Sequence, residues 1–208
     1  MIFFVTEFKQ SLLTSTSRIL KFWDLRIPTT PRKKGVSKSG APVSLYSSSV
    51  DPTTLHGSRR SRGIISLASG SGLLFALGAD SRIHTYGLPS LAAQSTVYTH
   101  DNLQANSFYV GLSMSPCGRW LASAGSGKSG STFLFDVENA SRAGSASQQG
   151  LELKGQKTGE VGAIDWAQDM LATCIDDGTV RVWRPDLETY LGCIKNPKER
   201  QWDWTWSI

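Results

Sequence analysis

Side chains that could do chemistry are few and scattered along this sequence. The histidines, His56, His84 and His100, stand far apart, and no cysteine pair has the spacing of zinc ligands. Asp176 and Asp177 are adjacent, so their carboxylates diverge on a turn, and Asp177 is expected to fix a hairpin. The sequence therefore predicts no catalytic residue, no metal site, no cofactor and no small-molecule substrate, and the protein is not expected to be an enzyme.

One glycine-rich stretch, Gly125-Ser-Gly-Lys-Ser-Gly130, superficially resembles a phosphate-binding loop. Such loops need a glycine five residues before the glycine of Gly-Lys-Ser, and here that position is Ala122. The stretch also precedes a predicted strand, whereas a phosphate-binding loop opens a helix. We therefore predict a hairpin loop at this position.

The elements that must position any site form a fourfold repeat. Its most regular part is a strand with aromatic residues near its end, found at residues 18–24, 82–87, 132–136 and 179–184. The ends of these strands are 63, 49 and 48 residues apart, whereas propeller repeats of the WD type run to about 40–45. The repeat predicts an all-β fold.

Further strands are predicted where β-branched and aromatic residues cluster between Gly, Ser, Asp and Pro. The predicted strands cover residues 2–5, 12–15, 18–23, 63–67, 73–77, 82–86, 95–98, 108–113, 120–124, 132–135, 151–153, 161–166, 170–173 and 179–183, with a short one near 43–46. Asp177-Gly178 predicts a tight hairpin, Asp80-Ser81 a weaker one, and Ser115-Pro-Cys-Gly118 a turn with glycine at positive φ. The Ala-, Ser-, Gly- and Gln-rich stretch 140–149 is expected to be a flexible connector.

Composition narrows the class of protein further. The chain is 39% hydrophobic and 19% charged, and it has no run of about 18 apolar residues, so no membrane span is expected. Its cysteines, Cys117, Cys174 and Cys193, are odd in number and scattered, which favours a reducing compartment. The net charge is +5, but residues 27–62 alone carry +6, so the basic character belongs to one insertion.

Three stretches of sequence carry a resemblance to a known family. They are Leu20-Lys-Phe-Trp-Asp-Leu-Arg26, Asn106-Ser-Phe-Tyr-Val110 followed by Leu112-Ser-Met-Ser-Pro116, and Ala172-Thr-Cys-Ile-Asp-Asp-Gly-Thr-Val-Arg-Val-Trp-Arg184. The repeats resemble blades of WD-repeat (WD40) β-propellers. Within that superfamily the chain resembles Denticleless-type proteins, the substrate receptors of the cullin-4 RING ubiquitin ligase.

The resemblance implies a ring of seven blades, of which this chain supplies about four. We therefore expect a partial propeller, either the C-terminal part of a longer protein or a chain with a misassigned start. The expected units are an incomplete first repeat (1–26), a basic Ser/Pro-rich insertion that is mostly disordered (27–62), three further repeats (63–91, 92–139 and 140–186), and a closing strand with a Trp-rich tail (187–208). The tail is expected to cover a blade or to bind a partner. Structural roles in the blades are expected for Trp23, Asp80, His100, Asp177 and Trp183.

The tetrapeptide Trp23-Asp24-Leu25-Arg26 matches the Trp-Asp-x-Arg box that, in this family of receptors, docks the propeller onto the ligase adaptor. Strand alternation places Trp23 and Leu25 on one face and Asp24 and Arg26 on the other. The resemblance therefore implies adaptor binding by Asp24, Leu25 and Arg26, with Trp23 filling the gap between blades. The alternative is that Asp24 and Arg26 form only a local surface pair.

The basic insertion has three interpretations. Its clusters are a nuclear-localisation signal, a phosphate-contacting nucleic-acid site or a solvated loop without a dedicated role. Thr30, followed by Pro31, is a candidate proline-directed phosphosite, and a phosphate there would offset part of the positive charge. The candidate localisation residues are Arg32, Lys33, Lys34, Arg59, Arg60 and Arg62.

The expected function is that of a protein-interaction module. The resemblance implies a substrate-recognition subunit that links an adaptor propeller protein to degron-bearing targets, which reach it on the DNA-loaded sliding clamp. The expected location is the nucleus, with the cytoplasm as a second compartment. The alternative is a general nuclear WD-repeat scaffold in RNA or chromatin assembly whose basic loop contacts nucleic acid.

Overall fold

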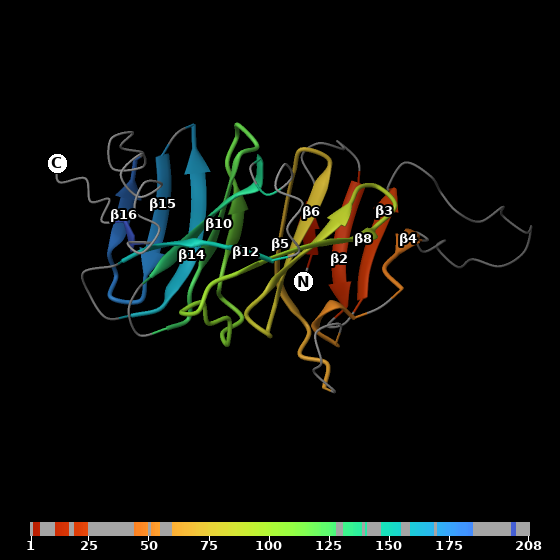
Figure 1. Cartoon of the computed structure of the whole chain (residues 1–208), viewed down its shortest axis with the longest axis horizontal. Coiled ribbons are helices and arrows are strands. Elements are labelled where there is room, and N and C mark those ends of the chain that lie inside the picture. Colours follow the sequence, from red (N-terminus) through yellow and green to blue (C-terminus); the bar gives the residue numbers. More distant parts are fainter. Residues whose placement is uncertain are drawn as a thin grey trace, which may run out of the picture.

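The computed structural model describes four antiparallel sheets that stand side by side in a row (Figure 1). We call them blades 1 to 4 in chain order. The described residues are 2–4, 11–16, 19–24, 44–49, 51–54, 60–127, 131–138, 140, 147–154, 159–168, 170–184 and 201–202. The expected all-β fold is confirmed.

Blades 1 and 2 are meanders of four consecutive strands. The strands of blade 1 are β1 (Ile2–Phe4), β2 (Ser11–Thr16), β3 (Ile19–Asp24) and β4 (Ser44–Ser47). Those of blade 2 are β5 (Ile64–Gly70), β6 (Leu73–Gly78), β7 (Ile83–Gly87) and β8 (Ala92–Thr99). A short 3-10 helix, η1 (Pro52–Thr54), lies between the two blades in the sequence. The predicted short strand near 43–46 is therefore present as β4.

Blades 3 and 4 follow the same plan, with four antiparallel strands in blade 3 and three in the described part of blade 4. Blade 3 contains β9 (Leu112–Met114), β10 (Trp120–Ala124), β11 (Thr132–Asp136) and β13 (Leu151–Leu153). Blade 4 contains β14 (Val161–Ala167), β15 (Met170–Ile175) and β16 (Val180–Trp183). Strands β8 and β13, expected to open the next sequence repeat, pair as the outer strands of the preceding blade. Each repeat thereby links two neighbouring sheets.

Two short strands join these blades in parallel from distant parts of the chain. Strand β12 (Ser147–Gln149) pairs with β8 on the outer side of blade 2, and β17 (Gln201–Trp202) pairs with β13 on blade 3. The expectation of a flexible connector over 140–149 is wrong for the last three residues, because pairing with β8 gives their backbone groups partners. Trp204 and Trp206 of the predicted tail lie outside the described residues.

The core lies between the blades, and strand alternation explains how it is built. In β6, Phe75 and Leu77 pack toward blade 3, whereas Leu74 and Ala76 pack toward blade 1. Successive side chains point to opposite faces of a strand, so a central strand with apolar residues at every position packs against two neighbouring blades at once.

Burial in this core raises the pKa of Tyr98 to about 12, with a smaller contribution from the charge of Asp136.

The predicted turns close these hairpins. Gly118 and Gly178 have φ of +74° and +79°, a region open to glycine, and their N–H groups donate to Ser115 and Ile175 carbonyls at 2.9 and 3.0 Å. The Asp177 carboxylate accepts hydrogen bonds from the N–H and the hydroxyl of Thr179. Ser81, in the weaker turn, adopts φ of +61°. These positions confirm the predicted turn chemistry.

Candidate protein-interaction surface

Strand β3 contains the first two residues of the predicted docking tetrapeptide, Trp23 and Asp24. Leu20 and Phe22 of this strand are buried against blade 2, and Trp23 is half-buried, with Lys21 Nζ 5.8 Å from the centroid of its ring. Asp24 is the last residue of β3. Leu25 and Arg26 lie outside the described residues, so adaptor binding by this tetrapeptide stays a prediction.

Of the predicted basic residues, the structure describes Arg60 and Arg62, and both are exposed. Arg32, Lys33, Lys34 and Arg59 lie outside the described residues, as does the candidate phosphosite Thr30. The localisation and nucleic-acid interpretations of this segment stay predictions.

Asp80 stands in the β6–β7 hairpin of blade 2 and meets a buried histidine. His84 Nε2 lies 3.2 and 3.4 Å from the two carboxylate oxygens of Asp80, and the two side chains are 4% and 10% exposed. Sequence reasoning expected a structural Asp80 but gave His84 no role. The pair ties the hairpin turn to strand β7.

His100 and Trp183 are held by their neighbours in blades 3 and 4. The His100 ring centroid lies 4.9 Å from that of Phe133, and its Nδ1 accepts the N–H of Asn102 at 3.1 Å. Trp183 is 1% exposed, and its indole Nε1–H donates to Thr173 Oγ1 at 2.9 Å. Across the described ranges no three His, Cys, Asp or Glu side chains gather as metal ligands would.

An exposed aromatic pair precedes β9. Phe108 and Tyr109 are 85% and 81% exposed. The predicted strand over 108–113 is wrong for its first four residues, because Ser107 starts a turn there. Its hydroxyl accepts the N–H of Tyr109 at 3.4 Å, and its carbonyl accepts the N–H of Val110 at 3.5 Å. Aromatic side chains on a protein surface are typical of interaction sites.

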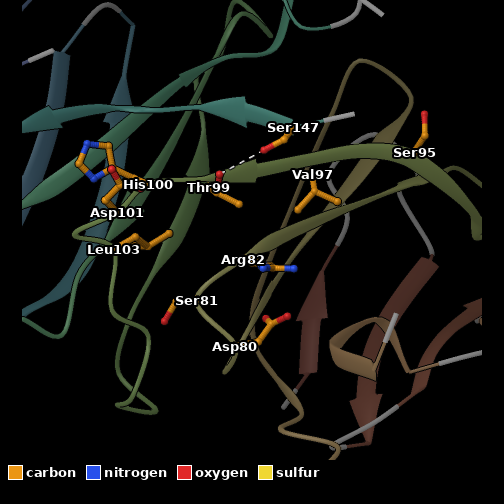
Figure 2. Close-up of a pocket in the computed structure, with 10 residues that line it drawn as sticks. All are labelled: Asp80, Ser81, Arg82, Ser95, Val97, Thr99, His100, Asp101, Leu103 and Ser147. Atoms are coloured by element: carbon orange, nitrogen blue, oxygen red, sulfur yellow. Dashed lines mark hydrogen bonds between the residues drawn. The ribbon is translucent and has the colours of Figure 1, made fainter. Parts of the chain in front are cut away.

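A pocket of about 600 Å³ opens on blade 2 (Figure 2). Its wall comes from the β6–β7 hairpin, the outer strand β8, the turn after β8 and strand β12. Sequence reasoning missed this pocket, since its residues span positions 80 to 147 and only the fold brings them together.

No helix in the described part of the chain is long and apolar enough to cross a membrane.

One thiol on the surface has a perturbed pKa. Partial burial raises the pKa of Cys117, but hydrogen bonds from the Ser115 hydroxyl, 3.2 Å away, and from nearby backbone N–H groups outweigh it, so the pKa lies below its ordinary value. Cys117 is exposed and unpaired. Its thiolate fraction at neutral pH is therefore raised.

We expect Cys117 to be alkylated by iodoacetamide with a pH midpoint below that of an ordinary cysteine. Ser115→Ala removes a hydrogen bond to the thiolate, so the midpoint should rise, and the wild-type rate should exceed the variant rate at neutral pH but not at alkaline pH, where the thiol is ionised in both proteins. Peptide-resolved mass spectrometry measures the rates, and Cys174, which is also exposed, serves as the internal reference for reagent reactivity. An unchanged midpoint in the variant would contradict the assigned cause.

Comparisons with known proteins agree with this architecture. No protein-family model matches the sequence. The chain is similar to "Cell division cycle protein cdt2" of Schizosaccharomyces pombe (strain 972 / ATCC 24843), with 30% identity over 192 residues that cover 89% of this chain and 35% of that protein. The chain thus spans about a third of the length of this curated relative.

Solved structures show the same fold at low sequence identity. The computationally designed Ika8 protein matches with a TM-score of 0.54 and 14% identity, over 88% of this chain and 44% of that one. A chain of the Mitotic Checkpoint Complex matches with a TM-score of 0.56 and 16% identity, over 85% and 46% of the two chains. The four blades, their meander order and these similarities show that the described residues form a partial β-propeller.

Proposed function

We propose that the chain is the substrate-recognition part of a cullin-4 ubiquitin ligase and acts in the nucleus. Its propeller fold is a protein-interaction fold, and the similarity to a cell division cycle protein supports a role in that process. In this role the chain performs no chemical step of its own. The chain brings an adaptor and a degron-bearing substrate together, which raises the local concentration of the substrate where ubiquitin transfer occurs, elsewhere in the ligase.

The observation that carries the proposal is that strand β3 of blade 1 ends at Asp24, the second residue of the Trp-Asp-Leu-Arg tetrapeptide. Arg26 follows two residues later in the sequence. An arginine in that position can offer a planar guanidinium to a carboxylate or to carbonyls of a docked partner. The Denticleless-type resemblance supports the same assignment and implies an adaptor propeller as that partner, and substrates presented on the sliding clamp.

The test is binding of the purified chain to the purified cullin-4 adaptor. We expect Arg26→Glu to weaken binding by at least about tenfold, because charge reversal removes a charge-assisted contact and adds repulsion. Arg62→Glu is the matched control, since Arg62 is exposed and carries the same charge change. Surface plasmon resonance measures both. If the wild-type chain does not bind the adaptor, or if both variants bind alike, the ligase assignment is wrong.

A second candidate function is a nuclear scaffold that contacts nucleic acid. The exposure of Arg60 and Arg62 favours it. Binding to RNA or DNA that weakens steeply with salt and is lost on neutralising the basic clusters would support this function. Adaptor binding lost in Arg26→Glu would decide against it as the main role.

A further inference from the structure

The pocket on blade 2 combines an apolar floor with a polar wall. Val97 and Leu103 are 7% and 3% exposed and form the apolar part. A cavity of about 600 Å³ falls within the usual range of ligand pockets, which runs to roughly 300–1,000 Å³. The remaining lining residues are polar or charged: Asp80, Ser81, Arg82, Ser95, Thr99, His100, Asp101 and Ser147.

Among the charged groups that line this pocket, the Arg82 guanidinium is the one without a recorded partner within the described residues. In Figure 2 its side chain lies in the middle of the lined space, between Asp80 and Val97. It is half-buried, and within the described residues the structure records neither a side-chain hydrogen bond nor an ion pair for it. A guanidinium offers five donors in a fixed fork that matches a carboxylate, so a partly desolvated one favours an anionic ligand.

The two carboxylates of the wall are already engaged elsewhere. Asp80 accepts from the buried His84 ring at 3.2 Å, and Asp101 accepts from Gln149 Nε2 at 3.4 Å. Their negative charges nevertheless face the same space and disfavour a ligand with two negative charges. A singly charged carboxylate therefore fits the pocket better than a phosphate dianion.

Hydroxyl groups line the side of the pocket formed by the paired strands β8 and β12. Thr99 Oγ1 and Ser147 Oγ lie 3.4 Å apart across that pairing, and Ser95 lies further along β8. Hydroxyls both donate and accept, so such a row can satisfy the N–H and C=O groups of an extended peptide backbone. Internal hydrogen bonds hold the wall in place, for example from the Ala105 N–H to Ser81 Oγ at 3.0 Å.

We propose that this pocket binds an extended peptide through an Asp or Glu side chain whose carboxylate pairs with Arg82. The hydroxyls of β8 and β12 contact the peptide backbone, and Val97 and Leu103 pack against its apolar atoms. That the peptide belongs to a ubiquitination substrate rests on the proposed function. Carboxylate binding by the pocket does not depend on it.

The test uses the full chain and bead-bound pentapeptide mixtures with a fixed central residue and randomised flanks. We expect retention by the Glu-centred mixture to exceed that by the Gln-centred mixture by about tenfold, the usual effect of a charge-assisted hydrogen bond. Arg82→Gln should abolish this preference, and Arg62→Gln, an exposed arginine outside the pocket, should keep it. Circular dichroism checks the fold of each variant.

A second variant keeps the test decisive if Arg82→Gln does not fold. Asp101→Asn removes a negative charge from the pocket wall and should strengthen binding of the Glu-centred mixture two- to threefold. Equal retention of Glu and Gln mixtures by the wild-type chain, or no retention of either, would overturn the proposal. Stronger retention of a phosphoserine-centred mixture than of the Glu-centred mixture would also overturn the proposal. The same holds if free N-acetylglutamate inhibits peptide retention at the same concentration as the free peptides do.

The two proposals fail separately in these experiments. Adaptor binding depends on Arg26 and is measured without peptide, whereas peptide binding depends on Arg82 and is measured without adaptor. If the chain binds the Glu-centred peptides but not the adaptor, it is a peptide-binding propeller outside a cullin-4 ligase. If it binds the adaptor but not the peptides, it is a ligase subunit that binds its substrate at another site.

Discussion

Trp183→Ala is expected to lower the free energy of unfolding by about 3–5 kcal/mol, the usual range for deleting a buried aromatic side chain. The indole is 1% exposed and packs with Leu134, Leu153 and Leu171 at the interface of blades 3 and 4. Its removal leaves a cavity between two sheets and also takes the hydrogen bond from Thr173 Oγ1, which is fully buried. Urea denaturation followed by circular dichroism measures the change.

Two further variants separate packing from hydrogen bonding at this position. Trp183→Phe keeps most of the apolar volume and should cost about 1–3 kcal/mol, mainly because Thr173 is left without its donor. Val182→Ala is the control on the same strand, since Val182 is 41% exposed and should cost less than about 1 kcal/mol. If Trp183→Ala costs no more than Val182→Ala, the interface between blades 3 and 4 is not formed in solution.

Glu152→Ala is expected to lower the free energy of unfolding by about 2–3 kcal/mol, because it takes hydrogen bonds from the buried Ser131 hydroxyl and from Asn102. The Glu152 side chain lies on β13 and is 2% exposed. Its carboxylate accepts from Ser131 Oγ at 2.6 Å and from Asn102 Nδ2 at 2.8 Å. These bonds join blade 3 to the turn that carries Asp101 and Leu103 of the pocket.

The same denaturation experiment includes two comparisons for Glu152. Glu152→Gln keeps one acceptor oxygen and should cost less than the alanine variant, while Glu160→Ala, in a partly exposed position, should stay within about 0.5 kcal/mol of wild type. A Glu152→Ala protein as stable as the Glu160→Ala protein would show that the buried carboxylate contributes nothing.

Most strands could be predicted because local pattern and burial agree in them. Every position of β6 is apolar or small, and β11 has the continuous apolar run Phe133-Leu-Phe135. Such runs are typical of strands covered on both faces, and both are central strands of their blades. The tight turn at Asp177-Gly178 was predictable for a similar reason, since its backbone conformation favours glycine. In these segments the local preference and the fold point to the same structure.

Other features depend on contacts between distant segments and could not be predicted from local pattern. The residues of β12 have little intrinsic preference for a strand, and they form one because they pair with β8, which lies about 50 residues earlier. The buried Glu152 carboxylate accepts hydrogen bonds from Ser131 and Asn102, which lie 21 and 50 residues away in the sequence. The pocket around Arg82 depends on the same assembly.

The alternation of side chains in β6 and β11 also determines how the blades are coupled. Each interior blade packs through one face on the sheet before it and through the other on the sheet after it. Such an array behaves as a one-dimensional chain with nearest-neighbour coupling, in which stability is a sum of blade terms and interface terms. In the described part of the chain, blades 1 and 4 are each stabilised by one such interface, so local opening should start in them and reach blades 2 and 3 last. The pocket, built on blade 2 and the turn that leads into blade 3, thus lies in the most cooperative part of the array.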